Sequence, residues 1–246
     1  MNIETYGVGE RMRYLTSYAR DITGSHLVLL PVPTTKDKKH ITGTEIPLSD
    51  TLLNVKEGSI VFGYGLPDEY KKEVKGLGGK IFDLSLDEEF LKENAHITAI
   101  GAVGYLLTNI KSMPEQLRVG VMGYGRIGSE LVKLLLFLGA KVKVYTSKVL
   151  TRIDLGSCGV DSVSVSEWDG CVHDFSGLDI LINTAPKDMR ECFPDGKIKN
   201  GMRIIELASG ENFKGIAEIE RLPGIPDKMY PASAAKAYVS AIRRAL

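Results

Sequence analysis

The sequence has no excess of either charge and little cysteine. Its 246 residues carry 31 lysines and arginines against 31 aspartates and glutamates, so the formal net charge is zero. Such a balance argues against the basic surface with which proteins bind nucleic acid or a membrane, and we expect neither partner. The three cysteines, Cys158, Cys171 and Cys192, form no C-x-x-C pair. This spacing predicts reduced thiols in a cytoplasmic protein.

Long apolar segments are also missing. No apolar run approaches the roughly 18 residues that a membrane-spanning helix needs. The N-terminal stretch MNIETYGVGERMRYL has no apolar core of the kind found in signal peptides, so we expect no secretion signal. Nothing in the pattern of residues predicts a metal site.

Short apolar runs alternate with helical patterns along the chain. Buried or amphipathic helices are expected over residues 99–110 and 129–138, with a charged helix between residues 64 and 80. The expected strands are residues 3–8, 27–32, 59–64, 80–84, 118–122, 141–145, 179–183 and 202–207. This alternation predicts an α/β fold with mainly parallel sheets. Two blocks of such units, joined by the buried helix, indicate two domains.

The stretch VMGYGRIGSE contains glycines spaced G-x-G-x-x-G between a predicted strand and a predicted helix. In that context Gly123 permits a tight turn, Gly125 lets backbone approach a pyrophosphate, and Gly128 lets the helix pack closely on the strand. The N–H groups at the start of the helix would face the phosphates. The unit therefore predicts a Rossmann dinucleotide site formed by Gly123, Tyr124, Gly125, Arg126, Ile127 and Gly128. A glycine-rich turn without a ligand is the alternative.

The residues after the second strand of this unit indicate the cofactor. NAD sites usually place an acidic residue there, about 20 residues past the first glycine, to bind the ribose hydroxyls. Here Thr146, Ser147 and Lys148 follow, with Arg152 nearby, and no acid occurs before Asp154. Hydroxyls and a cation suit a 2′-phosphate, so NADP is favoured and NAD is the alternative.

Two later strands should end at the same site, because ligands bind at the carboxyl ends of strands in open α/β sheets. The segment LDILINTAPKDM would bring one strand end beside the nicotinamide ribose, and MRIIELASGENF would bring the next. A plain β-α turn is the alternative for the first segment. The cofactor-binding residues expected here are Thr184, Ala185, Pro186, Leu207 and Ala208.

Several of these segments together resemble a known family. IGAVGYLLTNI, LRVGVMGYGRIGSELVKLLLFLGAKVKVYTSK, GLDILINTAP, IIELAS and LPGIPDKMYPASAAKAYVSAI look like the A subunit of bacterial dipicolinate synthase, and YGVGER and LLPVPTT extend the likeness to the first half. That family is related to the NAD(P)-binding D-2-hydroxyacid dehydrogenases. The resemblance implies two domains, with a last helix that packs back on the N-terminal one. It also implies a flavoprotein-like partner and, in sporulating bacteria, oxidation of a dihydro or hydroxy-tetrahydro precursor to pyridine-2,6-dicarboxylate.

The sequence departs from the family on the substrate side. The family pattern N-x-x-P-T-x-E-G becomes Asn94 to Gly101, with isoleucines at the Pro and Glu positions, 97 and 100. The pattern L-A-S-x-P-G-G becomes Leu207 to Asn212 without its Pro and one Gly, and a strand is missing between the first helix and residue 27. These departures keep a non-catalytic NAD(P)-binding partner or sensor as the alternative function. A divergent D-2-hydroxyacid dehydrogenase is a further alternative, although none of His26, His40, His96 and His173 follows the 202–207 strand.

Polar residues near predicted strand ends are candidates for binding and chemistry. Arg11 could clamp a substrate carboxylate in a bidentate manner, or it is a surface arginine. Thr34, Thr35 and Ser209 could donate hydroxyl hydrogen bonds, and the alternative for the two threonines is a polar loop. His96 and Glu206 are the candidate acid and base, or they are structural. Residues 36–40 are expected to form a solvated basic loop. Trp168 and residues 162–165 are expected to pack in an edge strand.

We therefore expect an α/β protein of two doubly wound domains. A smaller flavodoxin-like substrate domain would span residues 1–95, a Rossmann NAD(P)-binding domain residues 96–228, and a returning C-terminal helix residues 229–246. The expected function is an NADP-dependent oxidoreductase that acts on a dihydrodipicolinate-like cyclic dicarboxylate. It is expected to work as a homo-oligomer with a flavoprotein-like partner.

Overall fold

The chain divides into two compact units. The computed structural model describes residues 3–165, 175, 177–188, 193, 201–216 and 218–246. The first unit comprises Met1–Ile97 and Pro226–Leu246, and the second comprises Thr98–Ile225. Trp168, Cys171, His173 and Cys192 lie outside the described residues.

The first unit contains a four-stranded parallel sheet in the order β1-β2-β3-β4. Side chains alternate between its faces, as strands require: Leu27 and Leu29 face one apolar cluster, and Val28 and Val61 face another. The strands are β1 (Ile3–Thr5), β2 (Leu27–Leu29), β3 (Ile60–Gly63) and β4 (Lys80–Asp83). The four predicted strands are therefore present, and all are shorter than predicted, β1 and β2 by the most. Pro31 and Pro33, which lack an N–H donor, follow β2.

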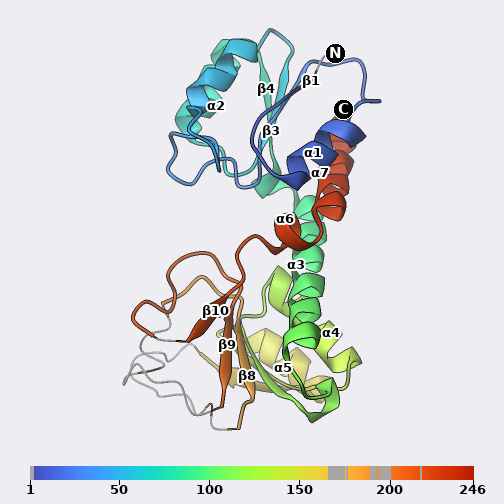
Figure 1. The fold of residues 1–246 in the computed structure, drawn as a ribbon, viewed down its shortest axis with the longest axis vertical. Coiled ribbons are helices and arrows are strands. Elements are labelled where there is room, and N and C mark those ends of the chain that lie inside the picture. Colours follow the sequence, from blue (N-terminus) through green and yellow to red (C-terminus); the bar gives the residue numbers. More distant parts are fainter. Residues whose placement is uncertain (1–2, 166–174, 176, 189–192, 194–200, 217) are drawn as a thin grey trace. The chain divides into compact units, whose positions relative to one another are not determined.

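Helices cover both faces of this sheet. α1 (Glu10–Tyr18) and α7 (Pro231–Ala245) lie side by side on one face (Figure 1). The 3₁₀ segment η1 (Leu48–Asn54) and α2 (Asp68–Gly76) contribute to the cluster on the other. The hydroxyl of the buried Tyr238 of α7 shares its one proton between the carbonyl oxygens of Leu30 and Phe62, which lie 2.9 and 3.0 Å away. No strand occurs between α1 and β2, as the sequence indicated.

The second unit contains six parallel strands in the order β10-β9-β8-β5-β6-β7. Numbered along this unit, the order is 3-2-1-4-5-6 read from β7, which is the order of dinucleotide-binding Rossmann sheets. The direction of winding changes between β5 and β8, where ligands bind in such folds. The strands are β5 (Arg118–Met122), β6 (Lys141–Thr146), β7 (Asp161–Ser164), β8 (Ile180–Asn183), β9 (Arg203–Glu206) and β10 (Ile219–Arg221). The predicted α/β class with parallel sheets is confirmed, and β7 is the predicted edge strand.

Apolar side chains fill both faces of the second sheet. One cluster joins the inward residues of β5, β6 and β8 to three helices, and it includes Val103, Leu131 and Leu155. These helices are α3 (Glu88–Asn109), α4 (Arg126–Phe137) and α5 (Val149–Ser157). The other face packs Tyr145 against Phe175, with ring centroids 5.3 Å apart. The remaining elements are the short helix α6 (Ile225–Met229) and the 3₁₀ segments η2 (Leu84–Leu86) and η3 (Pro114–Gln116).

Two helices begin earlier than the sequence indicated. α3 begins at Glu88 instead of residue 99, because the polar segment before the buried stretch also contains good helix formers. α4 begins at Arg126 instead of residue 129. Gly128 therefore lies within its first turn, where glycine is unfavourable by propensity and is used for close approach. None of the described helices is long and apolar enough to cross a membrane.

Candidate dinucleotide site

Gly123 and Gly125 lie between β5 and α4, Gly128 lies in the first turn of α4, and the structure places a different requirement on each position. Gly123 has a φ of +89°, a conformation that L side chains rarely adopt. A Cβ atom on Gly128 would lie 2.3 Å from the carbonyl oxygen of Gly123, so only glycine allows the helix this close to the turn. A Cβ atom on Gly125 would meet nothing within 4 Å. The fold therefore requires glycine at 123 and 128, whereas at Gly125 it leaves open space.

The first turn of α4 starts directly at this open space. Gly125 is the N-cap residue and has no side chain to cap the helix, and Ser129 N donates to its carbonyl oxygen at 2.9 Å. The first N–H groups of a helix have no acceptor within the helix, and the helix dipole adds positive potential there. A phosphate group fits the chemistry of this position.

A cleft of about 290 Å³ lies beside the turn, at the carboxyl ends of β5, β6 and β8. It brings together nine of the residues that the sequence proposed for the cofactor: Gly123, Tyr124, Gly125, Thr146, Ser147, Lys148, Thr184, Ala185 and Pro186. The other five do not line it. Arg126, Ile127 and Gly128 form the first turn of α4, and Leu207 and Ala208 follow β9.

Four further residues line the cleft that were not predicted from the sequence: Met122, Tyr145, Val165 and Lys187. Met122 is the last residue of β5 and Tyr145 the second-last of β6. Both are almost fully buried, at 1% exposure. The rule that ligands bind at the carboxyl ends of strands could have found these two. Val165 and Lys187 lie just past strand ends, and no separate signal in the sequence marks them.

The end of β6 presents hydroxyls and a cation to the cleft. Thr146 is 4% exposed, and its Oγ1 accepts a hydrogen bond from Lys148 N at 3.3 Å. Ser147 and Lys148 are exposed. None of the described residues that line the cleft is acidic. Asp154, the first acid after the strand, lies in α5 and is not a lining residue.

The loop after β8 is tied to the glycine turn. Thr184 donates to the carbonyl oxygen of Met122 from its N–H at 2.8 Å and from its Oγ1 at 2.9 Å. The Cβ atom that glycine lacks at position 123 would lie 2.8 Å from this hydroxyl. Thr184 and Gly123 therefore fit together as one wall of the cleft.

Glu206, a candidate base, is 4% exposed at the end of β9 and does not line the cleft. Its carboxylate accepts hydrogen bonds from Asn183 Nδ2 at 3.0 Å and from Ala208 N at 2.9 Å. Burial raises the pKa of Glu206, and the amides of Asn212, Ala208 and Asn183 oppose that shift. Ser209 is exposed, and its carbonyl oxygen accepts from Asn212 Nδ2 at 3.1 Å.

Arg11 is buried in the first unit, where its side chain contacts Asn94 and Asp227. Its side chain is 4% exposed, and Nη2 donates to Asn94 Oδ1 at 2.9 Å. Its Nε lies 3.0 Å from Asp227 Oδ1 without the alignment of a hydrogen bond. Burial lowers the pKa of Arg11, and Asp227 opposes that shift. The guanidinium that we expected to clamp a carboxylate of the substrate is thus already paired with a carboxylate of the chain.

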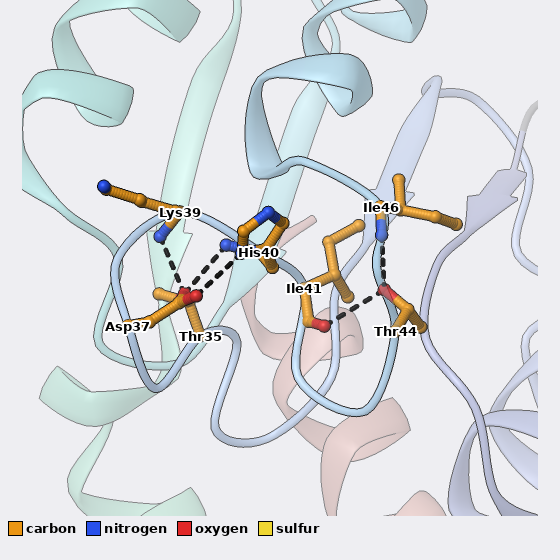
Figure 2. Close-up of polar contacts among 7 residues, drawn as sticks. All are labelled: Thr35, Asp37, Lys39, His40, Ile41, Thr44 and Ile46. Carbon is orange, nitrogen blue, oxygen red and sulfur yellow. Dashed lines mark hydrogen bonds and ion pairs between the residues drawn. The ribbon is translucent and has the colours of Figure 1, made fainter.

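The two candidate threonines of the first unit also have internal partners. Thr34 is fully buried, donates to the carbonyl oxygen of Pro31 at 3.0 Å and accepts from Tyr64 N at 2.8 Å. Thr35 donates to Asp37 Oδ1 at 3.1 Å (Figure 2). These bonds give Thr34 a structural role and leave Thr35 at the start of a polar loop.

That loop is organised around Asp37 (Figure 2). The carboxylate accepts hydrogen bonds from the N–H groups of Lys39 and His40, at 2.9 and 2.8 Å, and pairs with His40 Nδ1 at 2.7 Å. The N–H and side chain of His40 hold the pKa of Asp37 well below its usual range. The predicted basic segment, residues 36–40, is therefore largely exposed. Its backbone at Lys39 and His40 and the ring of His40 contact the carboxylate of Asp37.

His96 lies on the exposed side of α3. Arg11, Thr34 and Thr35 belong to the first unit, and Glu206 and Ser209 belong to the second. Among the described residues, no group of three or more His, Cys, Asp or Glu side chains could hold a metal ion. The candidate site that the structure assembles from one unit is the cleft at the glycine turn.

No known family model matches the chain, and no curated protein matches its sequence. Solved structures do match. The A subunit of dipicolinate synthase from Bacillus halodurans has a TM-score of 0.76 at 17% identity, over 99% of this chain and 96% of that one. The A chain of dipicolinate synthase from Bacillus subtilis has a TM-score of 0.71 at 17% identity, over 99% and 95%. A transhydrogenase from Sinorhizobium meliloti has a TM-score of 0.63 at 17% identity, over 88% and 72%. The expected resemblance is confirmed at the level of the fold.

Proposed function

We propose that the protein binds a nicotinamide dinucleotide in the cleft of its second unit, with NADP(H) preferred to NAD(H). We further propose that it uses this cofactor to oxidise a small cyclic dicarboxylate. The observation that carries the proposal is the glycine turn. Close packing explains Gly128 and a positive φ explains Gly123, but within the protein nothing occupies the position that a side chain at Gly125 would take.

The cleft offers a place for each part of the cofactor. The turn from Gly123 to Arg126 would hold the pyrophosphate, because its N–H groups and the start of α4 favour anions. Ser147 and Lys148 would bind the 2′-phosphate of the adenosine ribose. The segment from Thr184 to Pro186 would lie beside the nicotinamide ribose. When bound, the nicotinamide ring supplies a hydride acceptor.

The substrate class is proposed from the fold likeness to the A subunit of dipicolinate synthase. A dihydropyridine dicarboxylate would lose a hydride to the cofactor and a proton to a base to become aromatic. A hydroxy-tetrahydro precursor would first lose water to give that dihydro compound. Of the residues suggested by the sequence, Thr35 and Ser209 remain the candidates for binding its carboxylates, with His96 as acid or base. Arg11, Thr34 and Glu206 are buried and bonded to other residues of the chain. A flavoprotein-like partner and a homo-oligomer belong to the same proposal.

A second function is favoured by the contacts in the first unit. Arg11 and Thr34, the strongest substrate candidates of the sequence, are buried and bonded to other residues of the chain. A protein that binds NADP(H) as a non-catalytic partner or sensor needs only the second unit's cleft. This alternative shares the cofactor site and differs only in the chemistry.

Calorimetric titration of the full chain with NADPH and with NADH tests the cofactor proposal. We expect both to bind, with NADPH at least tenfold tighter. The absence of binding by either would refute the proposal. Adding pyridine-2,6-dicarboxylate to the NADP⁺-loaded protein then separates the two functions: a ligand-dependent rise in Tm supports the enzyme, and no rise supports the non-catalytic protein.

A further inference from the structure

Asn183 and Glu206 form a buried polar pair outside the cleft. They are the last residues of the neighbouring strands β8 and β9, and they are partners in the sheet register. Asn183 is fully buried and Glu206 is 4% exposed. Asn183 Nδ2 donates to Glu206 Oε1 at 3.0 Å and lies 3.3 Å from Oε2. Neither side chain lines the cleft, so neither is placed to touch a ligand there.

The side chain of Asn183 also fixes the loop that follows it. Its Oδ1 accepts from Ala185 N at 3.1 Å, and its Nδ2 donates to the carbonyl oxygen of Ala185 at 2.9 Å. Both polar groups of the Ala185 backbone are thereby bonded to one amide side chain. Because Thr184 Oγ1 also donates to the carbonyl oxygen of Met122, the loop after β8 is fixed at both Thr184 and Ala185.

Glu206 decides which way the amide of Asn183 faces. A carboxylate accepts hydrogen bonds and cannot donate, so it selects the Nδ2 side of the amide. The same carboxylate oxygen accepts from Ala208 N at 2.9 Å, which fixes the carboxylate itself. With the amide reversed, Asn183 would present an oxygen to Glu206 and to the carbonyl of Ala185. The pair therefore has one favourable arrangement.

We infer that Asn183 and Glu206 are positioning residues that hold the loop Thr184–Ala185–Pro186 in the shape that receives the nicotinamide half of the dinucleotide. Glu206 acts through Asn183 and not as the base that the sequence suggested. The inference rests on the proposed function. It predicts that loss of the pair weakens binding of the nicotinamide half and spares the adenosine half, whereas a general loss of stability would weaken both. The proposed adenosine site lies at the end of β6, and β5 lies between that strand and β8.

The test compares two ligands that share the adenosine half. NADPH and adenosine 2′,5′-bisphosphate are titrated into the wild-type chain and into Asn183→Ala and Glu206→Leu, whose side chain at 206 cannot accept a hydrogen bond. We expect the Kd of NADPH to rise about tenfold in both variants, from the loss of roughly one well-placed hydrogen bond. The Kd of the bisphosphate should change less than about twofold. Asp179→Asn is the matched control, because Asp179 forms an exposed ion pair with Arg118 just before β8, at the opposite end of that strand.

A second measurement needs no ligand. Backbone amide exchange at Ala185 should become at least tenfold faster in Glu206→Leu, whereas exchange across residues 146–148 should stay as in the wild type. Unchanged exchange at Ala185, or equal weakening of both ligands, would overturn the inference. If the wild type binds neither ligand, the proposed function fails, and the exchange at Ala185 still decides whether the pair positions the loop.

Discussion

Replacing Gly125 with valine should separate cofactor binding from folding. The backbone at Gly125 has φ −86° and ψ −161°, an extended conformation that valine adopts readily. A Cβ atom there meets nothing within 4 Å. We therefore expect the free energy of unfolding to change by less than about 1 kcal/mol, as is usual for substitutions that create neither a cavity nor a clash.

The effect on binding should be much larger. The valine side chain would occupy the space through which a pyrophosphate approaches the first turn of α4. A hydrogen bond to a charged group contributes about 1.5–3 kcal/mol. The loss of one or two such bonds, roughly 3 kcal/mol in total, corresponds to a rise of about 100-fold in the Kd of NADPH.

Fluorescence titration with NADPH and thermal unfolding measure the two effects on the same samples. Gly76→Val is the matched control, because Gly76 is an exposed glycine of α2 in the first unit whose added Cβ would also meet nothing within 4 Å. It should bind NADPH as the wild type does. A Gly125→Val protein that folds and binds NADPH with unchanged affinity would refute the assignment of the turn.

Three further substitutions test other parts of the structure. Lys148→Glu should weaken NADPH by about tenfold and leave NADH nearly unchanged in calorimetric titrations, whereas Lys141→Glu, at the other end of β6, should alter neither. Arg11→Ala should lower the free energy of unfolding in urea by about 2 kcal/mol, because the half-buried carboxylate of Asp227 loses its cationic partner. An unchanged free energy of unfolding would show that the ion pair does not contribute to stability. For Asp83, burial alone would raise the pKa, but hydrogen bonds from Ser85, Lys71 and the loop hold the pKa below its ordinary value. A depressed pKa adds stability above the unfolded-state value of about 4 that is lost as the pH falls, so Asp83→Asn should destabilise the protein at pH 7 and much less at pH 3, and a constant difference would contradict this.

Much of the second unit could be predicted from the sequence because its signals are local. The strand, the glycine spacing and the following helix lie within about 30 residues, and each element has its own apolar period. The prediction that Thr146, Ser147 and Lys148 line the cleft rested on the same β-α-β unit. The start of α4 could not be predicted in this way, since glycine reads as a turn until its close approach to Gly123 is known.

The roles of Arg11, Thr34 and Glu206 could not be predicted, because their partners are distant in the sequence. Arg11 pairs with Asp227, which lies near the other end of the chain. Thr34 bonds across to Tyr64, and Glu206 across to Asn183. A polar residue near a strand end looks the same in the sequence whether it faces a ligand or a buried partner. Only the burial and the contacts distinguish the two.

A crystal structure of the full chain grown with NADP⁺ tests the central claim most directly. We expect the pyrophosphate against the backbone at Gly125, the 2′-phosphate beside Lys148, and the nicotinamide ribose beside Thr184. The cofactor bound elsewhere, or the cleft at the glycine turn closed to it, would contradict the proposed site.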